Sequence, residues 1–163
     1  MQRAVELAGF YAAHAIWCVS DGEALVPMLG QESPTQGRNM IRFALDRLED
    51  GVKRGQDHLR SNPERCERAA LVYDGYITVA SDRSDALFIV IRSYVDPGAT
   101  LTMAIPYRNA SDPQGFAVHR PKIVDWQGSG QPDYIALTEA FFRGVESHEK
   151  GAAVWNAALH ESI

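Results

Sequence analysis

Three short stretches of this chain hold side chains whose types and spacing could support chemistry. The first contains His14 and Cys18, which are four residues apart and on a helix would share one face, where both could ligate a metal ion. No third ligand stands at a matching spacing, and a buried histidine bonded to a carbonyl group accounts for His14 more simply. We therefore predict no metal site at this position.

The second stretch places Asp21 and Glu23 just beyond His14 and Trp17. The two carboxylates could form a small acidic site at the start of a helix. Capping and the helix dipole already explain carboxylates in such a place, so the pattern alone does not indicate a function. We treat His14, Trp17, Asp21 and Glu23 as the candidate lining of a ligand pocket between the first helix and the sheet.

The third stretch is His119-Arg120, which precedes Pro121 on a predicted strand. The arginine could bind an anionic ligand, and the histidine could act as a general acid or base. An exposed edge strand would show such residues to solvent in any case. His119 and Arg120 are therefore a second candidate cluster, with no catalytic role assigned to either residue.

The strong sequence motifs of catalysis and cofactor binding do not occur in this chain. There is no phosphate-binding glycine loop, no nucleophile elbow, no paired CxxC and no HExxH. We therefore expect no cofactor and no bound metal, and binding is a better expectation than catalysis.

Composition indicates one ordinary globular domain over residues 1–163. Hydrophobic residues make up 45% of the chain and charged residues 23%, which is typical of a folded protein. The formal charge of −5 argues against a nucleic-acid partner, because such proteins need a net basic face. The apolar runs are too short for a membrane span, and the two cysteines imply no disulfide. We expect an acidic cytoplasmic protein with no membrane association.

The candidate residues must be positioned by a sheet whose centre is predicted at residues 69–107. Residues 86–95 are apolar at both alternating sets of positions, so this strand should be covered on both faces. Asp96-Pro97-Gly98 is typical of a turn, and residues 101–107 then alternate as a strand apolar on one face. These two strands should form a hairpin.

Two further strands complete the predicted sheet. Asp74-Gly75 could be the turn of a hairpin between two short strands, or a glycine bulge in one strand over residues 69–80. We favour the bulged strand, because a long strand matches its long neighbour. Residues 116–126 should form a fourth strand, interrupted by Pro121 and therefore at an edge or bulged.

Helices are predicted on both sides of this sheet region. Residues 2–19 carry two apolar stripes, which predicts a deeply buried helix. Ser20 and Glu23 have capping-box spacing for a short second helix, and Ser33-Pro34-Thr35-Gln36 predicts the start of a helix that runs to about Arg60. From Pro132 a long helix should continue almost to the end, with His148 on its apolar face, and Gly151 could divide it.

The predicted fold is therefore α+β, an antiparallel meander of about four strands packed with two N-terminal helical segments and a long C-terminal helix. If all helices lie on one face, a second copy must close the other, which makes a homodimer a direct alternative. Three functions follow. The first is an accessory protein that acts through a protein partner or its own dimer, the second a small-ligand binder or enzyme, and the third an immunity-type inhibitor.

Overall fold

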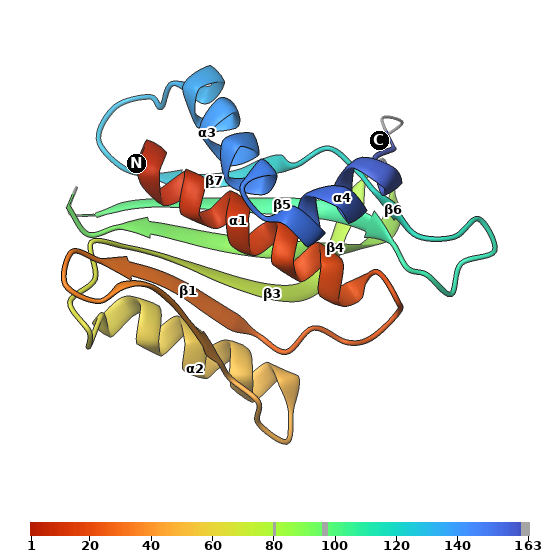
Figure 1. Cartoon of the computed structure of the whole chain (residues 1–163), viewed down its shortest axis with the longest axis horizontal. Coiled ribbons are helices and arrows are strands. Elements are labelled where there is room, and N and C mark those ends of the chain that lie inside the picture. The colour runs from red at the N-terminus through yellow and green to blue at the C-terminus, as the bar shows by residue number, and fades with distance from the viewer. Residues whose placement is uncertain (80, 96–97, 161–163) are drawn as a thin grey trace.

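The computed structural model describes residues 1–79, 81–95 and 98–160, which fold as one antiparallel sheet with helices packed on it (Figure 1). The helices are α1 (Gln2–Val19), α2 (Leu48–Ser61), α3 (Tyr134–Glu146) and α4 (Glu149–Ala158). The strands are β1 (Met28–Ser33), β2 (Gly37–Arg42), β3 (Arg68–Val79), β4 (Asp82–Ser93), β5 (Ala99–Arg108), β6 (Ala117–Val118) and β7 (Lys122–Gln127). The predicted α+β class with an antiparallel sheet is confirmed.

The sheet is larger than the sequence predicted. It has seven strands in the order β2-β1-β3-β4-β5-β6, and β7 pairs with β5 beside β6. The central hairpin of β4 and β5 is present, as is the interruption before Pro121 that separates β6 from β7. The residues Asp96 and Pro97 of the predicted turn lie outside the described part of the chain.

The added strands, β1 and β2, form a hairpin over residues for which the sequence predicted the start of a helix. The predicted capping contact does exist, because the backbone N–H of Gln36 donates to Ser33 Oγ over 3.0 Å. It closes the turn between two strands instead of opening a helix, and α2 begins only at Leu48. Around Asp21 the backbone N–H of Glu23 donates to the aspartate carboxylate at 3.1 Å, and this stretch is a loop with no second helix. Ser, Asp and Asn make such contacts in turns as readily as at helix starts.

The favoured single long strand is confirmed, because β3 is continuous through Asp74-Gly75, but the bulge predicted at Gly75 is wrong. The register of β3 with β4 runs unbroken from Arg68 to Val79, with neither a turn nor a bulge. The ring of Phe88 explains the glycine, since a Cβ on Gly75 would lie 3.1 Å from it. A bulge does occur in the sheet, between β5 and β7 at Thr102 and Met103.

Three helices cover one face of the sheet, here called the inner face. The helix α1 lies against β1, β3 and β4, and α3 and α4 pack across α1 from the far end of the chain (Figure 1). The predicted deep burial of residues 2–19 is confirmed, because eleven residues of α1 are buried. The predicted single C-terminal helix is wrong, since it ends at Glu146 and restarts at Glu149, where His148 caps the second part.

The opposite, outer face of the sheet is covered only in part. The helix α2 packs on β1 and β3 through a small second core of Leu29, Phe43, Leu59, Ala69 and Leu71. On β4 the outward-facing Phe88 and Val90 stay half-buried, whereas the inward-facing residues Leu87, Ile89 and Ile91 are fully buried. The cover predicted for both faces of this strand is thus complete on one face only. Among the described residues, no helix is long and apolar enough to cross a membrane.

Candidate binding groove

An apolar groove of about 640 Å³ lies between the edge of the sheet and α3. Its walls come from β5, from the connection between β6 and β7, from α3 and from the segment after α4. The lining residues are Met103, Arg120, Pro121, Ile123, Tyr134, Thr138, Phe141, Phe142 and Leu159. We call this hollow the β7–α3 groove, and its size and aromatic lining are typical of binding sites.

The two walls of this groove, formed by β5 with β7 and by α3, are fixed by contacts within the fold. Met103 and Ile123 pair across β5 and β7, and the bulge follows directly after them. On the opposite wall, Phe141 is fully buried against the ring of Trp155, with ring centroids 6.0 Å apart. The first turn of α3 is fixed by Asp133, whose carboxylate accepts the backbone N–H of Ala136 at 3.0 Å.

Exposed apolar side chains form part of the groove. Eleven large hydrophobic residues are exposed in the described chain, and three of them, Ile123, Tyr134 and Leu159, belong to its lining. Val124 and Ile135, each next in sequence to one of these three, are exposed as well, and Ile135 is 75% exposed. Soluble proteins rarely leave apolar surface gathered in this way unless it binds something.

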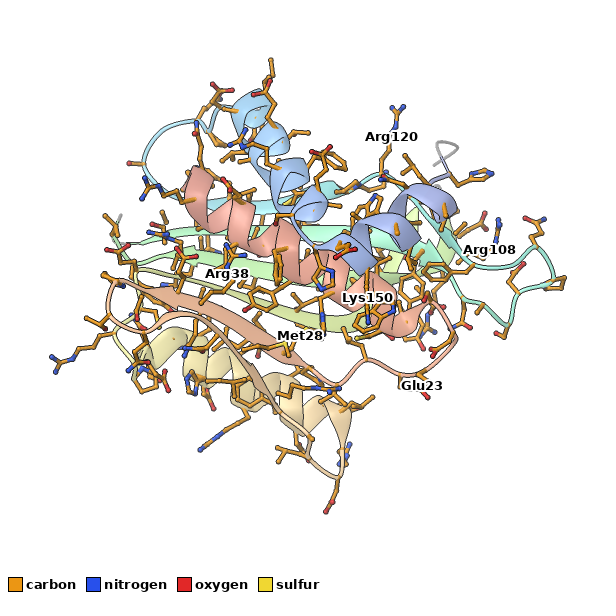
Figure 2. The ribbon with its side chains drawn as sticks, in the orientation of Figure 1. Glu23, Met28, Arg38, Arg108, Arg120 and Lys150 are labelled. Carbon is orange, nitrogen blue, oxygen red and sulfur yellow. The ribbon has the colours of Figure 1, made fainter. Side chains whose placement is uncertain are left out.

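One end of the groove is closed by the chain itself. Leu159 forms a parallel bridge with Val118, and the backbone N–H of His160 donates to the carbonyl of Val118 at 2.8 Å. Arg120 projects outward at the same end of the molecule (Figure 2). The groove is therefore bounded by backbone on one side and by a positive charge at its rim.

The predicted pocket residue His14 has a partner that the sequence did not reveal. Its Nδ1 lies 3.0 Å from Nε2 of His148, which belongs to the junction of α3 and α4. His148 Nδ1 accepts the backbone N–H of Gly151 at 2.9 Å, so the hydrogen of the neutral ring sits on Nε2 and is donated to His14. Burial, the neighbouring His148 and Arg42 lower the pKa of His14. This pair joins α1 to α4 as a structural contact.

Three of the four residues predicted around the first helix share one hollow. Trp17, Asp21 and Glu23 line a space of about 280 Å³ together with Cys18 and Arg42, whereas His14 does not belong to this lining. The hollow lies beyond the end of α1, beside β2, and its walls are mostly polar. It can hold a small polar group close to one arginine and two carboxylates.

The structure separates the second predicted cluster, His119 and Arg120. His119 is 4% exposed and faces a polar hollow of about 620 Å³ beside Tyr107 and His160, whereas Arg120 lines the β7–α3 groove. Successive residues of an extended chain point to opposite sides, which explains the separation. Burial is the main cause that lowers the pKa of His119.

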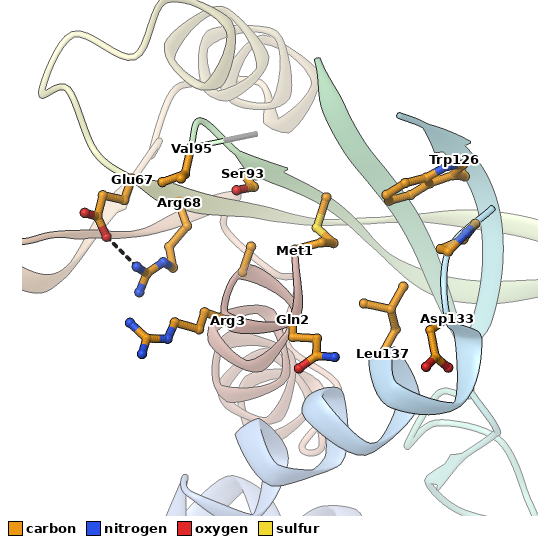
Figure 3. Close-up of a pocket in the computed structure, with 12 residues that line it drawn as sticks. Met1, Gln2, Arg3, Glu67, Arg68, Ser93, Val95, Trp126, Asp133 and Leu137 are labelled. Carbon is orange, nitrogen blue, oxygen red and sulfur yellow. Dashed lines mark hydrogen bonds and ion pairs between the residues drawn. The ribbon is translucent and has the colours of Figure 1, made fainter. Parts of the chain in front are cut away.

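Another hollow, of about 660 Å³, lies at the start of α1 and α3 (Figure 3). Its charged walls already serve structural roles. Arg68 pairs with Glu67 and Glu32, and Asp133 caps α3. Within the described residues there is also no group of three or more His, Cys, Asp or Glu side chains that could hold a metal ion.

The sequence did not identify the β7–α3 groove as a site. Its aromatic residues Phe141 and Tyr134 belong to the apolar face of the predicted C-terminal helix. Phe141 is buried in the core, whereas Tyr134 is exposed. The available signal was the pair Ile123 and Val124, two apolar residues in succession on a strand predicted to lie at an edge. No known protein family, curated protein or solved structure matches the chain.

Proposed function

We propose that this chain is a binding protein that holds apolar side chains of a partner polypeptide in the β7–α3 groove. The observation that carries the proposal is the apolar and aromatic lining of the groove, of which Ile123, Tyr134 and Leu159 are exposed to solvent. Interfaces between proteins have an apolar centre of this kind, rich in aromatic residues and surrounded by polar groups.

The extent of the apolar surface favours a polypeptide over a small molecule. A small ligand would contact only the lining of the groove, but Val124 and Ile135 are exposed and do not line it. A partner polypeptide that extends beyond the groove along β7 and α3 would cover these residues as well.

The groove can be filled without disturbing the core, which gives a direct test. Thr138 is exposed and lines the groove, whereas its neighbour Glu139 is exposed and does not. We expect peptides selected from a random phage-displayed library on the wild-type protein to share spaced apolar positions. Thr138→Trp should weaken their binding at least about tenfold, because the indole occupies the space that the peptide side chains need. Fluorescence anisotropy measures the affinities.

Glu139→Trp is the matched control, since it adds the same side chain to the same helix outside the groove. It should leave the peptide affinity within about twofold of the wild type. Equal binding to Thr138→Trp, or no enriched peptides at all, would contradict the proposal. A wild-type dimer in light scattering that Thr138→Trp converts to monomer would assign the groove to a second copy of the chain instead.

A second candidate function uses the hollow beside the end of α1. Trp17, Asp21 and Glu23 converge there with Arg42, which favours a small polar ligand with both charged and hydrogen-bonding groups. Zwitterionic metabolites that bind there should quench tryptophan fluorescence. Trp17→Phe should remove the signal without removing binding, whereas Arg42→Gln should remove binding itself. This pair of results would support the candidate.

A further inference from the structure

Among the described residues, none pairs with the charge of one arginine on the outer face of the sheet. Arg92 lies near the end of β4, opposite Ala69 of β3 and Thr100 of β5, so its side chain shares the face that α2 covers only over β1 and β3. In the described part of the chain it forms neither an ion pair nor a hydrogen bond, and its Nε is buried without a partner. Its guanidinium carbon lies 5.5 Å from the centroid of the Tyr94 ring.

This situation differs from that of the other half-buried arginines of the sheet. Arg68 pairs with Glu32 and Glu67, and Arg108 donates to Gln114 and to the carbonyl of Gly115. An N–H group that loses water without gaining an acceptor costs free energy, and the cost rises for a charged group. The buried Nε–H of Arg92 therefore lowers the stability of the isolated chain.

The surroundings of Arg92 are those of an interface. Tyr73 and Phe88 stack at 5.7 Å on the same face, next to Val90, and all three remain half-buried. Thr100 and Thr102 add hydroxyl groups from β5. None of the hollows described above is lined by these residues, whereas a small molecule needs a concave site, so the surroundings of Arg92 suit a protein partner better.

We propose that the outer face of β4 and β5 docks a partner protein through a carboxylate that binds Arg92. A carboxylate accepts two parallel N–H bonds from a guanidinium, which would satisfy the buried Nε–H and neutralise the charge. The aromatic and aliphatic side chains around it supply the apolar contact that excludes water from the ion pair. This surface lies on the opposite side of the sheet from the β7–α3 groove and does not depend on it.

The first test measures the cost of the unpaired charge. Arg92→Met keeps the length and the apolar stem but removes the guanidinium, so we expect a higher Tm than in the wild type. Arg54→Met on the exposed side of α2 is the matched control and should leave Tm unchanged within about 1 °C. A fall in Tm for Arg92→Met relative to this control would overturn the proposal, because the guanidinium would then contribute to the fold itself.

The second test measures binding of a carboxylate directly, with sodium phenylacetate as the probe and 2-phenylethanol as its neutral counterpart. In ¹H–¹⁵N spectra we expect a saturable shift of the Arg92 side-chain Nε–H with phenylacetate and none with the alcohol. Arg92→Gln should weaken phenylacetate binding at least about tenfold, the loss that follows when a charge-assisted hydrogen bond is removed. Arg54→Gln should bind as the wild type does. No saturable shift, equal shifts with the alcohol, or unchanged affinity in Arg92→Gln would each overturn the proposal.

Discussion

At the scale of single residues, the contact between His14 and His148 shows how one histidine sets the state of another. The capping bond from Gly151 leaves His148 with its hydrogen on Nε2, so His14 must offer a lone pair at Nδ1. A proton added to His14 at this atom would face the hydrogen of its partner. The nearby charge of Arg42 also disfavours that added charge. The pair therefore stabilises the fold only while His14 is neutral.

We expect the protein to lose stability in mild acid. The pKa values of His14 and His119 are lowered from 6.5 in the folded chain, mainly by burial, so the unfolded chain binds protons more readily. This contribution to stability is complete above the unfolded pKa and is lost as the pH falls through 6.5 toward the lowered folded values. Urea unfolding at about pH 7.5 and about pH 5.5 measures the loss.

The variant His14→Gln should reduce this pH dependence without abolishing it, because His119 still titrates. The double variant with His119→Gln should reduce it further. A pH dependence that both variants leave unchanged would show that other groups cause the acid sensitivity.

At the scale of the elements, two glycines decide how closely α1 and α3 approach. A Cβ on Gly144 would lie 1.9 Å from the carbonyl oxygen of Glu6, and one on Gly9 would lie 2.0 Å from that of Phe141. Both contacts are with backbone, which cannot move aside as a flexible side chain can. The two helices thus pack backbone against backbone, and only glycine fits at these points.

The substitution Gly144→Ala should therefore destabilise the protein, although alanine is the better helix former. We expect a loss of about 2 kcal/mol or more in the free energy of unfolding, since overpacking outweighs the gain in helix propensity. Glu139→Ala, on the exposed side of the same helix, should change stability by less than about 0.5 kcal/mol. Urea denaturation of both variants decides the question, and equal stabilities would contradict the close packing.

The elements also show where sequence patterns suffice. The alternation of Leu87, Ile89 and Ile91 identified β4, and the two stripes of residues 2–19 identified α1, because burial on a large core leaves a periodic signal. The hairpin of β1 and β2 was missed since Ser33 makes a capping-type bond that serves a turn as well as a helix. The groove could not be predicted because it depends on where α3 lies relative to β7. No local sequence pattern encodes that position.

At the scale of the whole molecule, the sheet separates two cores of unequal size. The inner core joins α1, α3 and α4 to β1 and to the strands β3 to β6, whereas the outer core ties α2 to β1 and β3 through a few side chains. Local opening is easiest where few apolar contacts hold an element. The two faces of the sheet should therefore differ in dynamics as well as in the surfaces that they offer.

We expect hydrogen exchange to reveal this difference. The amides in the middle of α2 should exchange faster than those in the middle of α1 under the same conditions. Leu59→Ala, which removes a buried contact of α2, should speed exchange in α2 further and leave α1 unchanged. Uniform protection of both helices would instead indicate a single cooperative unit.

The backbone contact between Gly9 and Gly144 also has a consequence for protein synthesis. The helix α1 leaves the ribosome before any strand of the sheet, but the surface that fits it closely belongs to α3, which is translated after all seven strands. Until then the apolar stripes of α1 have no complete site in which to pack. The nascent chain must therefore carry α1 without its complete packing surface until all seven strands and α3 have been made.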